Sequence, residues 1–261
     1  VDYTDRVAPQ VEATGRVRTF ALGRSDDPQV LPRAYNEGIR RARGDILVIP
    51  DADVYCHGDL LETVAAELTA DGDEVLYVLR LDQAKRRYRP GQDAAHVRAT
   101  ATLRHTHNFG GCVAVARRHL LAINGYEELP FFAGYLQSGF DNWIRFKNLG
   151  LKVRWHPTQR VVHPWHPTPP AGKFENRAAQ KRLIARRAAS GEVLAYCGLD
   201  PARNRPYDDD APLPTDWPNV MTERGLYRHA EGVVFEPRPG RPGGGLCARL
   251  RRWLRRAGHG D

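Results

Sequence analysis

The sequence lacks the patterns that mark disulfide-rich, zinc-binding and membrane-spanning proteins. Its four cysteines, Cys56, Cys112, Cys197 and Cys247, are widely spaced, and no CxxC pair occurs. This spacing argues against a zinc site or a disulfide framework and favours a reducing compartment. No apolar run reaches the roughly 18 residues that a membrane-spanning helix needs, and no signal peptide is recognisable. We therefore expect a cytoplasmic protein.

The sequence also has no internal repeat and does not begin with Met, which is consistent with a missing N-terminal piece. Its 261 residues, 41% hydrophobic and 27% charged, suffice for one large domain or for one domain with an appendage. The 39 Lys and Arg exceed the 31 Asp and Glu and give a net charge of +8. Such a charge suits phosphorylated small molecules, an anionic membrane or nucleic acid. Nucleic acid is disfavoured because no element interleaves its basic residues with aromatic residues.

Apolar runs and turn signals predict helices that alternate with strands. The predicted helices cover residues 32–44, 59–72, 139–150 and 173–191, the predicted strands cover residues 46–49, 74–80 and 151–157, and residues 110–126 read as a strand followed by a short helix. This alternation predicts an α/β fold with a mostly parallel, doubly wound sheet flanked by helices. Residues 85–104 are expected to form a mobile loop or an irregular helix. The prolines of residues 161–170 are expected to prevent a regular element there.

Two carboxylates follow the first of these strands directly, in the sequence Pro50-Asp51-Ala52-Asp53. Residues two apart on an extended segment point to the same side, and ligands of open α/β sheets bind at the carboxyl ends of strands. Paired carboxylates in that place suit Mg²⁺ or Mn²⁺ that bridges to a phosphate. The alternative is a solvated acidic turn, since a bare DxD pattern is common.

Four segments together resemble a family 2 glycosyltransferase of the GT-A fold. They are "AYNEGIRRARGDILVIPDADV", "FGGCVAVARRHLLAINGYEE", "GFDNWIRFKNLGLKV" and "VVHPWHPTPPAGKFENR", in the order of the family and over about half of the chain. The last two are similar to chondroitin-polymerase-like and galactosyltransferase-like members. Two departures stand out: the first strand and helix of the family have no counterpart after Val1, and the usual Glu-Asp pair reads Phe140-Asp141.

The resemblance implies a metal-dependent, inverting transferase that moves a sugar from a nucleotide-diphospho-sugar, expected to be a UDP-sugar, to a hydroxyl group. Asp53 is then the metal ligand, His163 or its competitor His166 completes the Mn²⁺ or Mg²⁺ site, and Asp51 supports the ribose or the metal shell. Without the resemblance, the loop that contains the two histidines reads as a packed turn. Gly110 and Gly111 are expected to let the backbone approach the donor sugar, although a bulge or tight turn would also use them.

Asp141 is the candidate general base, which would take the proton of the attacking acceptor hydroxyl in a single displacement. The alternative is that Asp141 simply favours the first turn of its helix. Phe140 stands where the family carries a Glu that often helps to bind the acceptor, so it points to a different acceptor or to lost activity.

The expected organisation is a nucleotide-sugar and acceptor domain over residues 1–170, a helical and irregular extension over 171–235, and a linker with a basic amphipathic tail over 236–261. Residues 246–257 have the composition of a short helix on an anionic membrane, which would suit a glycan or lipid-linked acceptor. Two other readings stay open at this point. One is a nucleotidyltransferase, whose related sheets also place acids at strand ends, and the other is a catalytically degenerate GT-A module attached to a membrane.

Overall fold

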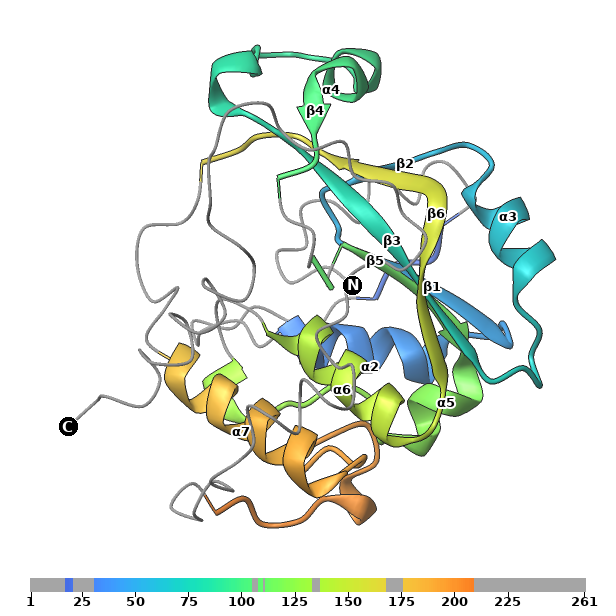
Figure 1. Cartoon of the computed structure of the whole chain (residues 1–261), viewed down its shortest axis with the longest axis vertical. Helices are drawn as coiled ribbons and strands as arrows, with labels where there is room; N and C mark the ends of the chain where they lie inside the picture. Colours follow the sequence, from blue (N-terminus) through green and yellow to red (C-terminus); the bar gives the residue numbers. More distant parts are fainter. Residues whose placement is uncertain are drawn as a thin grey trace, which may run out of the picture.

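A six-stranded sheet flanked by helices forms the centre of the protein (Figure 1). The computed structural model describes residues 17–20, 31–104, 108–109, 111–132, 137–167 and 176–208. The helices are α2 (Leu31–Arg41), α3 (Leu60–Glu67), α4 (Ala94–Thr100), α5 (Arg117–Ala122), α6 (Ser138–Asn148) and α7 (Arg177–Ser190), with short 3₁₀ turns η1 (Lys85–Arg87), η2 (Pro130–Phe132) and η3 (Pro201–Arg203). The strands are β1 (Ile46–Pro50), β2 (Tyr55–Cys56), β3 (Glu74–Gln83), β4 (Ala101–Thr102), β5 (Cys112–Ala116) and β6 (Lys152–His163).

The strand order is β1-β5-β3-β6-β2, with β4 beside β3. The predicted α/β class, a sheet flanked by helices, is confirmed. The directions differ from the prediction, because among the described pairings only β3 with β6 is parallel and the other four are antiparallel. The physical reason is that a continuously apolar strand reports burial on both faces of the sheet and carries no information about its direction.

Both faces of the sheet are buried, which explains the unbroken apolar run of β3. Val75, Tyr77 and Leu79 face the larger core, together with side chains of α2, α5, α6 and α7. Leu76 and Val78, which alternate with them, face a smaller core closed by α3. Figure 1 shows α3 on one side of the sheet and α2, α5, α6 and α7 gathered on the opposite side. Alternate residues of one strand therefore supply two separate cores.

The carboxyl ends of β1, β3 and β6 meet at one edge of the sheet. β5 is antiparallel to both β1 and β3, and β6 is parallel to β3, so β1, β3 and β6 run in the same direction. β6 reaches His163, which corrects the expectation that prolines prevent a regular element from residue 161 onward. The register shifts between the pairs Tyr77–Trp155 and Leu79–Arg160, and this irregularity accommodates Pro157 within the strand.

The predicted extension after residue 170 shares the core of the sheet where it is described. Ile184 and Ala188 of α7 and Leu199 beyond it are buried in the same apolar cluster as Val75 of β3. The extension up to residue 208 is thus packed against the first domain, while the predicted linker and tail of residues 236–261, including the membrane contact of 246–257, lie outside the described residues. No helix in the described part of the chain is long and apolar enough to cross a bilayer.

Two of the family-like motifs meet in a buried turn that joins α2 to the chain after α5. The Asn36 side chain accepts a hydrogen bond from the Tyr126 backbone N–H at 2.8 Å and donates to the Tyr126 carbonyl at 2.9 Å. Asn124 and Gly125 both have positive φ, and a Cβ at position 125 would lie 2.3 Å from Oδ1 of Asn36. Only glycine fits this close approach, so the Asn-Gly pair serves the packing of α2.

Candidate functional site

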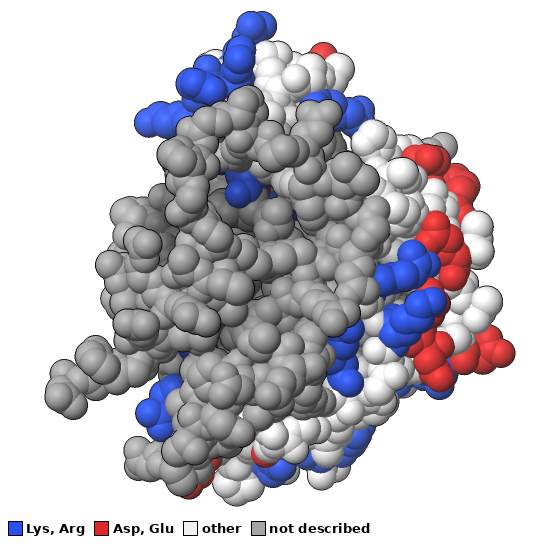
Figure 2. Space-filling view, in the orientation of Figure 1, with Lys and Arg blue, Asp and Glu red and all other residues white. Residues whose placement is uncertain are grey.

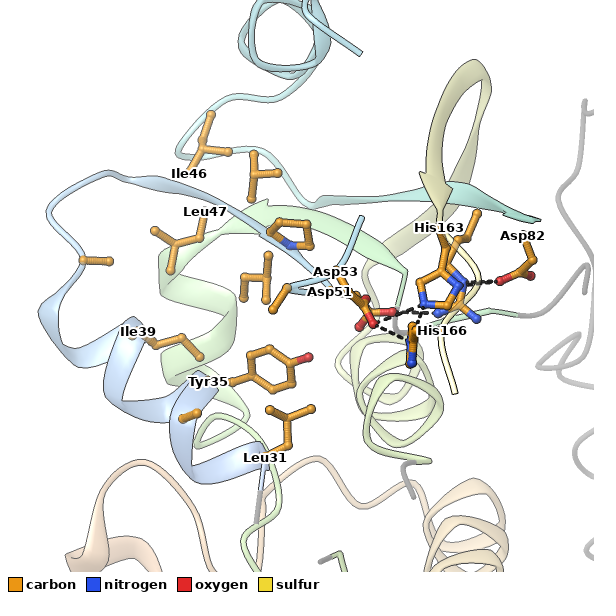
Figure 3. A pocket seen from close by; sticks show the side chains of 18 of the residues that line it. Leu31, Tyr35, Ile39, Ile46, Leu47, Asp51, Asp53, Asp82, His163 and His166 are labelled. Atoms are coloured by element: carbon orange, nitrogen blue, oxygen red, sulfur yellow. Dashed lines mark hydrogen bonds and ion pairs between the residues drawn. The ribbon is translucent and has the colours of Figure 1, made fainter. Parts of the chain in front are cut away.

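The edge where β1, β3 and β6 end carries a cluster of one carboxylate and two imidazoles (Figure 3). Oδ2 of Asp53 lies 3.1 Å from Nε2 of His163 and 3.1 Å from Nε2 of His166, and the two imidazole nitrogens are 3.2 Å apart. All three potential ligand atoms lie within 4.8 Å of one another. The structure thus brings both candidate histidines to Asp53, where the sequence left a choice between them.

A second layer of charge lies behind this cluster. Nδ1 of His163 is 3.2 Å from Oδ1 of Asp82, at the end of β3, and Nε of Arg80 is 3.1 Å from the same oxygen. Nη1 of Arg80 also donates to Oδ2 of Asp51 at 2.9 Å. Arg80 therefore joins the two carboxylates and compensates the repulsion that closely spaced acids would otherwise suffer.

The pKa shifts show how strongly these groups are coupled. The hydrogen bond from His163 lowers the pKa of Asp53 to about 2. Burial alone would lower the pKa of His163, but its hydrogen bonds to Asp53 and Asp82 outweigh burial and raise this pKa to about 9. The pKa of Asp51 is raised, mainly by burial, against the opposing effect of Arg80. An ionised Asp53 thus faces a proton on His163, and a metal cation that replaced this proton would keep the negative charge compensated.

The cluster stands at one end of a pocket of about 1020 Å³. Asp51, Asp53, Arg80 and Asp82 line its charged end, together with both histidines. The other end is apolar and is formed by side chains of α2 and β1, namely Leu31, Ala34, Tyr35, Ile39, Ile46, Leu47 and Ile49. Figure 3 shows the Tyr35 ring between these two parts of the pocket. The arrangement can accept a ligand that is anionic at one end and flat or apolar at the other.

Of the two predicted glycines, only Gly111 lies among the described residues. Gly110 lies outside the described residues. The carbonyl of Gly111 accepts a hydrogen bond from the Asp51 backbone N–H at 3.1 Å. A Cβ at position 111 would lie 2.9 Å from Cβ of Arg80, so glycine leaves the room that the Arg80 side chain needs. In the described structure Gly111 therefore positions Asp51 and Arg80, and its approach to a donor sugar stays a prediction.

Asp141 lies in a different environment, inside a buried charge cluster away from the pocket. Its side chain is fully buried, with one carboxylate oxygen 2.9 Å from Nε of Arg145 and the other bound by Arg187 of α7. Arg187 also pairs with the fully buried Glu127, which accepts hydrogen bonds from the backbone of residues 196 and 197. Both oxygens of Asp141 are thus occupied, and the residue is not part of the pocket lining. Its role as general base stays a prediction that this geometry does not favour.

Phe140, the departure from the family pattern, also packs inward. Its ring stacks on Phe109, with 4.9 Å between ring centroids and 24° between the ring planes. The apolar side chain therefore extends the aromatic part of the larger core.

Sequence reasoning missed Asp82 and Arg80, which complete the charged end of the pocket. The signal was present, since "RLDQ" places an acid at the end of a second buried strand, just as "IPDAD" does for the first. What was lacking was the direction of the strands. Only when β1, β3 and β6 are known to be parallel to one another does Asp82 fall beside Asp53 and His163.

Comparison with protein families assigns the sequence to one family. The family model described as "Glycosyl transferase family 2" matches residues 4–140, slightly more than half of the chain. The chain therefore belongs to glycosyl transferase family 2, as the four motifs predicted, and the predicted enzyme class, a glycosyltransferase, is confirmed. No match was found among curated proteins.

Two solved structures are similar to this chain at low sequence identity. One is the mannosyltransferase PcManGT from Pyrobaculum calidifontis in complex with GDP-Man and Mn²⁺, with 16% identity and a TM-score of 0.48 over 87% of this chain and 57% of its own. The other is GalNAc-T7 with UDP, GalNAc and Mn²⁺, with 14% identity and a TM-score of 0.48 over 85% of this chain and 45% of its own. The chain thus spans about half the length of these two proteins.

Proposed function

We propose that this chain transfers a sugar from a nucleotide-diphospho-sugar to a hydroxyl group of a glycan acceptor, with the help of a divalent metal ion. The observation that carries the proposal is the Asp53–His163–His166 cluster at the charged end of the pocket. Sugar transfer leaves a diphosphate with increasing negative charge, and a metal ion held by this cluster would stabilise that charge as a Lewis acid. The family membership of the chain supports the same reaction class.

The ligand atoms favour Mn²⁺ over Mg²⁺. Mg²⁺ prefers a shell of oxygen atoms only, whereas imidazole nitrogen suits transition metals. Two imidazole nitrogens and one carboxylate oxygen leave further positions for water and for diphosphate oxygens. Asp51, which Arg80 holds beside the cluster, would face the ribose, and the apolar end of the pocket near Tyr35 would take the nucleobase.

We further propose that the transfer is a single displacement that inverts the anomeric configuration, as the sequence motifs imply. In such a reaction the acceptor hydroxyl attacks from the face opposite the departing diphosphate and gives up its proton to a base. Asp141 is the base candidate from the sequence, and to accept this proton its carboxylate must first leave its buried contacts with Arg145 and Arg187.

Calorimetry with a panel of nucleoside diphosphates, each with and without Mn²⁺, tests the proposed function. We expect one diphosphate, UDP by the family resemblance, to bind when Mn²⁺ is present and to bind far more weakly when EDTA removes the metal. The sugar donor with the matching base is then supplied to a glycan acceptor, and the anomeric configuration of the product is read by NMR. If no nucleoside diphosphate binds in the presence of Mn²⁺, the proposed function is wrong.

Asp82 is proposed as the residue that orients His163 toward the metal. The hydrogen bond to Oδ1 of Asp82 would keep the proton of His163 on Nδ1 and leave Nε2, the atom beside Asp53, free to bind the ion. Loss of such a partner typically weakens metal binding about 10- to 100-fold. We expect this loss in Asp82→Asn, measured by titration of Mn²⁺ in electron paramagnetic resonance, and no change in Asp73→Asn, an exposed acid just before β3. Equal Mn²⁺ affinity of the two variants would rule out the orienting role.

A further inference from the structure

A group of exposed basic residues stands beside the pocket. Lys85, Arg86, Arg87 and Arg89 follow the end of β3, and we call them the basic ridge. All four are exposed, and none forms an ion pair with another residue in the described part of the chain. Figure 2 shows Lys and Arg side chains gathered at the top of the molecule, where Figure 1 places the segment that leads to α4, while Asp and Glu gather near α3. Among the described residues, no acidic side chain therefore compensates the positive charge of the ridge.

An aromatic pair connects the basic ridge to the metal cluster. Tyr88, in the middle of the ridge, is 40% exposed, and its ring centroid lies 5.1 Å from that of Trp165. Trp165 stands between the two histidines in sequence and lines the pocket. Nζ of Lys85 lies 5.5 Å from the centroid of the Trp165 ring. Charge, exposed aromatic surface and the candidate metal ligands therefore adjoin one another.

The ridge is held in place by hydrogen bonds around the buried Gln83. The Gln83 amide exchanges two hydrogen bonds of 2.9 Å with Gln92, donates to the hydroxyl of Thr100 at 2.8 Å, and accepts from the Trp165 backbone N–H at 3.1 Å. The imidazole of His96 lies 2.9 Å from the Arg87 carbonyl. Of the two alternatives expected for residues 85–104, a mobile loop or an irregular helix, the structure shows the second, with η1 and α4 in this range, and these contacts fix the aromatic pair relative to the site. A surface fixed in this way loses little entropy when it binds a ligand.

We propose that the basic ridge and the Tyr88–Trp165 pair bind the acceptor, and that this acceptor is an anionic saccharide. The apolar face of a sugar ring can lie against an exposed aromatic ring, while Arg and Lys recognise carboxylate or phosphate groups. The four ridge side chains do not line the pocket, whereas Arg104 does, so positive charge for the donor diphosphate is already provided inside. The inference rests on the proposed function, since it assigns the second substrate of the same site.

Binding measured with paired saccharides tests this inference. One probe is a hexasaccharide of alternating glucuronic acid and N-acetylglucosamine, and its neutral counterpart has the carboxyl groups reduced to alcohols. A second pair is a phosphodiester-linked mannose oligosaccharide and the same oligosaccharide without phosphate, so that carboxylate and phosphate are distinguished. Each is titrated into the full chain with Mn²⁺ and the nucleoside diphosphate that binds. We expect at least one anionic probe to bind about tenfold or more tightly than its neutral counterpart.

Variants then locate the site. Arg86→Ser with Arg87→Ser should weaken binding of the anionic probe about tenfold, because two exposed charge contacts are lost. Tyr88→Ala should weaken the anionic probe and its neutral counterpart alike, through the lost aromatic contact. Arg33→Ser with Arg43→Ser removes the same charge from exposed positions outside the ridge and should leave both affinities unchanged. All variants should keep the wild-type affinity for the nucleoside diphosphate.

Three results would overturn the inference while leaving the transferase proposal intact. The first is equal binding of anionic and neutral probes, or of neither, by a protein that binds the nucleoside diphosphate with Mn²⁺. The second is an equal loss in the ridge and control variants. The third is tighter binding of an oligouridylate of similar length. The ridge places Tyr88 among basic residues, which corrects the expectation that no element does so, and such surfaces also bind single-stranded RNA. Absence of nucleoside diphosphate binding would instead overturn the proposed function itself.

Discussion

Asp53→Asn is expected to lose measurable Mn²⁺ binding and to lower sugar transfer about a thousandfold or more. Asp53 supplies the only carboxylate of the described three-residue cluster, and its Oδ2 is the atom to which both imidazoles point. Loss of metal stabilisation of the leaving diphosphate costs several kcal/mol, and each 1.4 kcal/mol corresponds to about tenfold in rate. Mn²⁺ binding is followed by electron paramagnetic resonance and transfer by release of the nucleoside diphosphate.

Asp59→Asn is the matched control for this substitution. Asp59 lies six positions further along, is exposed, and makes no side-chain capping bond at the start of α3. It should bind Mn²⁺ and transfer sugar like the wild-type chain. An Asp53→Asn variant that keeps wild-type Mn²⁺ affinity would show that the ion binds elsewhere. A variant that loses Mn²⁺ binding yet transfers sugar normally would show that the cluster is not needed for the reaction.

Much of the order of helices and strands could be predicted from the sequence. Apolar runs indicate which segments are buried, and glycines indicate where a helix ends. The strand that became β1 and the helix that became α7 are examples, and α7 ends before Gly191, which has a φ of +76°. The end of β6 could not be predicted, since a bulge lets it continue past Pro157 to His163. Its direction relative to β1 and β3, which decides what meets at the sheet edge, depends on pairings between distant residues.

The candidate site shows the same limit of prediction from sequence, because its contacts also join residues that are far apart in the chain. Asp53 is predicted from its place after an apolar strand, the two histidines are predicted from the resemblance to a family, and the geometry adds Asp82 and Arg80 behind them. Asp141 is also predicted from a motif, but a motif gives no information about the atoms that surround a residue in the folded protein. Burial and pairing arise only when α6 packs against α7. Motif residues such as Asn36 likewise turn out to hold the fold together.

Arg187→Met is expected to lower the free energy of unfolding by about 3–5 kcal/mol, the usual cost of removing one partner from a buried ion pair. Arg187 is fully buried between Asp141 and Glu127, and burial opposes its charge while these two acids raise its pKa above the ordinary value. Without it, two carboxylates would lose their contact with the cation in a core that excludes water. Such a loss is a large part of the 5–15 kcal/mol that stabilises a typical domain.

Urea unfolding at low temperature measures this effect, with Arg43→Met as the control. Arg43 is exposed between α2 and β1, so its replacement should change the free energy of unfolding by less than about 0.5 kcal/mol. If Arg187→Met were as stable as the control, the buried cluster would not be what fixes α7 to the domain.

Asp141→Asn, studied alongside, separates the two roles open to this residue. It keeps the size of the side chain but removes the charge that Arg145 and Arg187 contact, so we expect a loss of stability comparable to that of Arg187→Met. Transfer and nucleotide binding should then fall together, in proportion to the unfolded fraction, and recover at lower temperature. An Asp141→Asn variant with wild-type stability and nucleotide affinity but no transfer would instead establish Asp141 as the base. In that case α6 would have to move during the reaction to free the carboxylate from its two arginines.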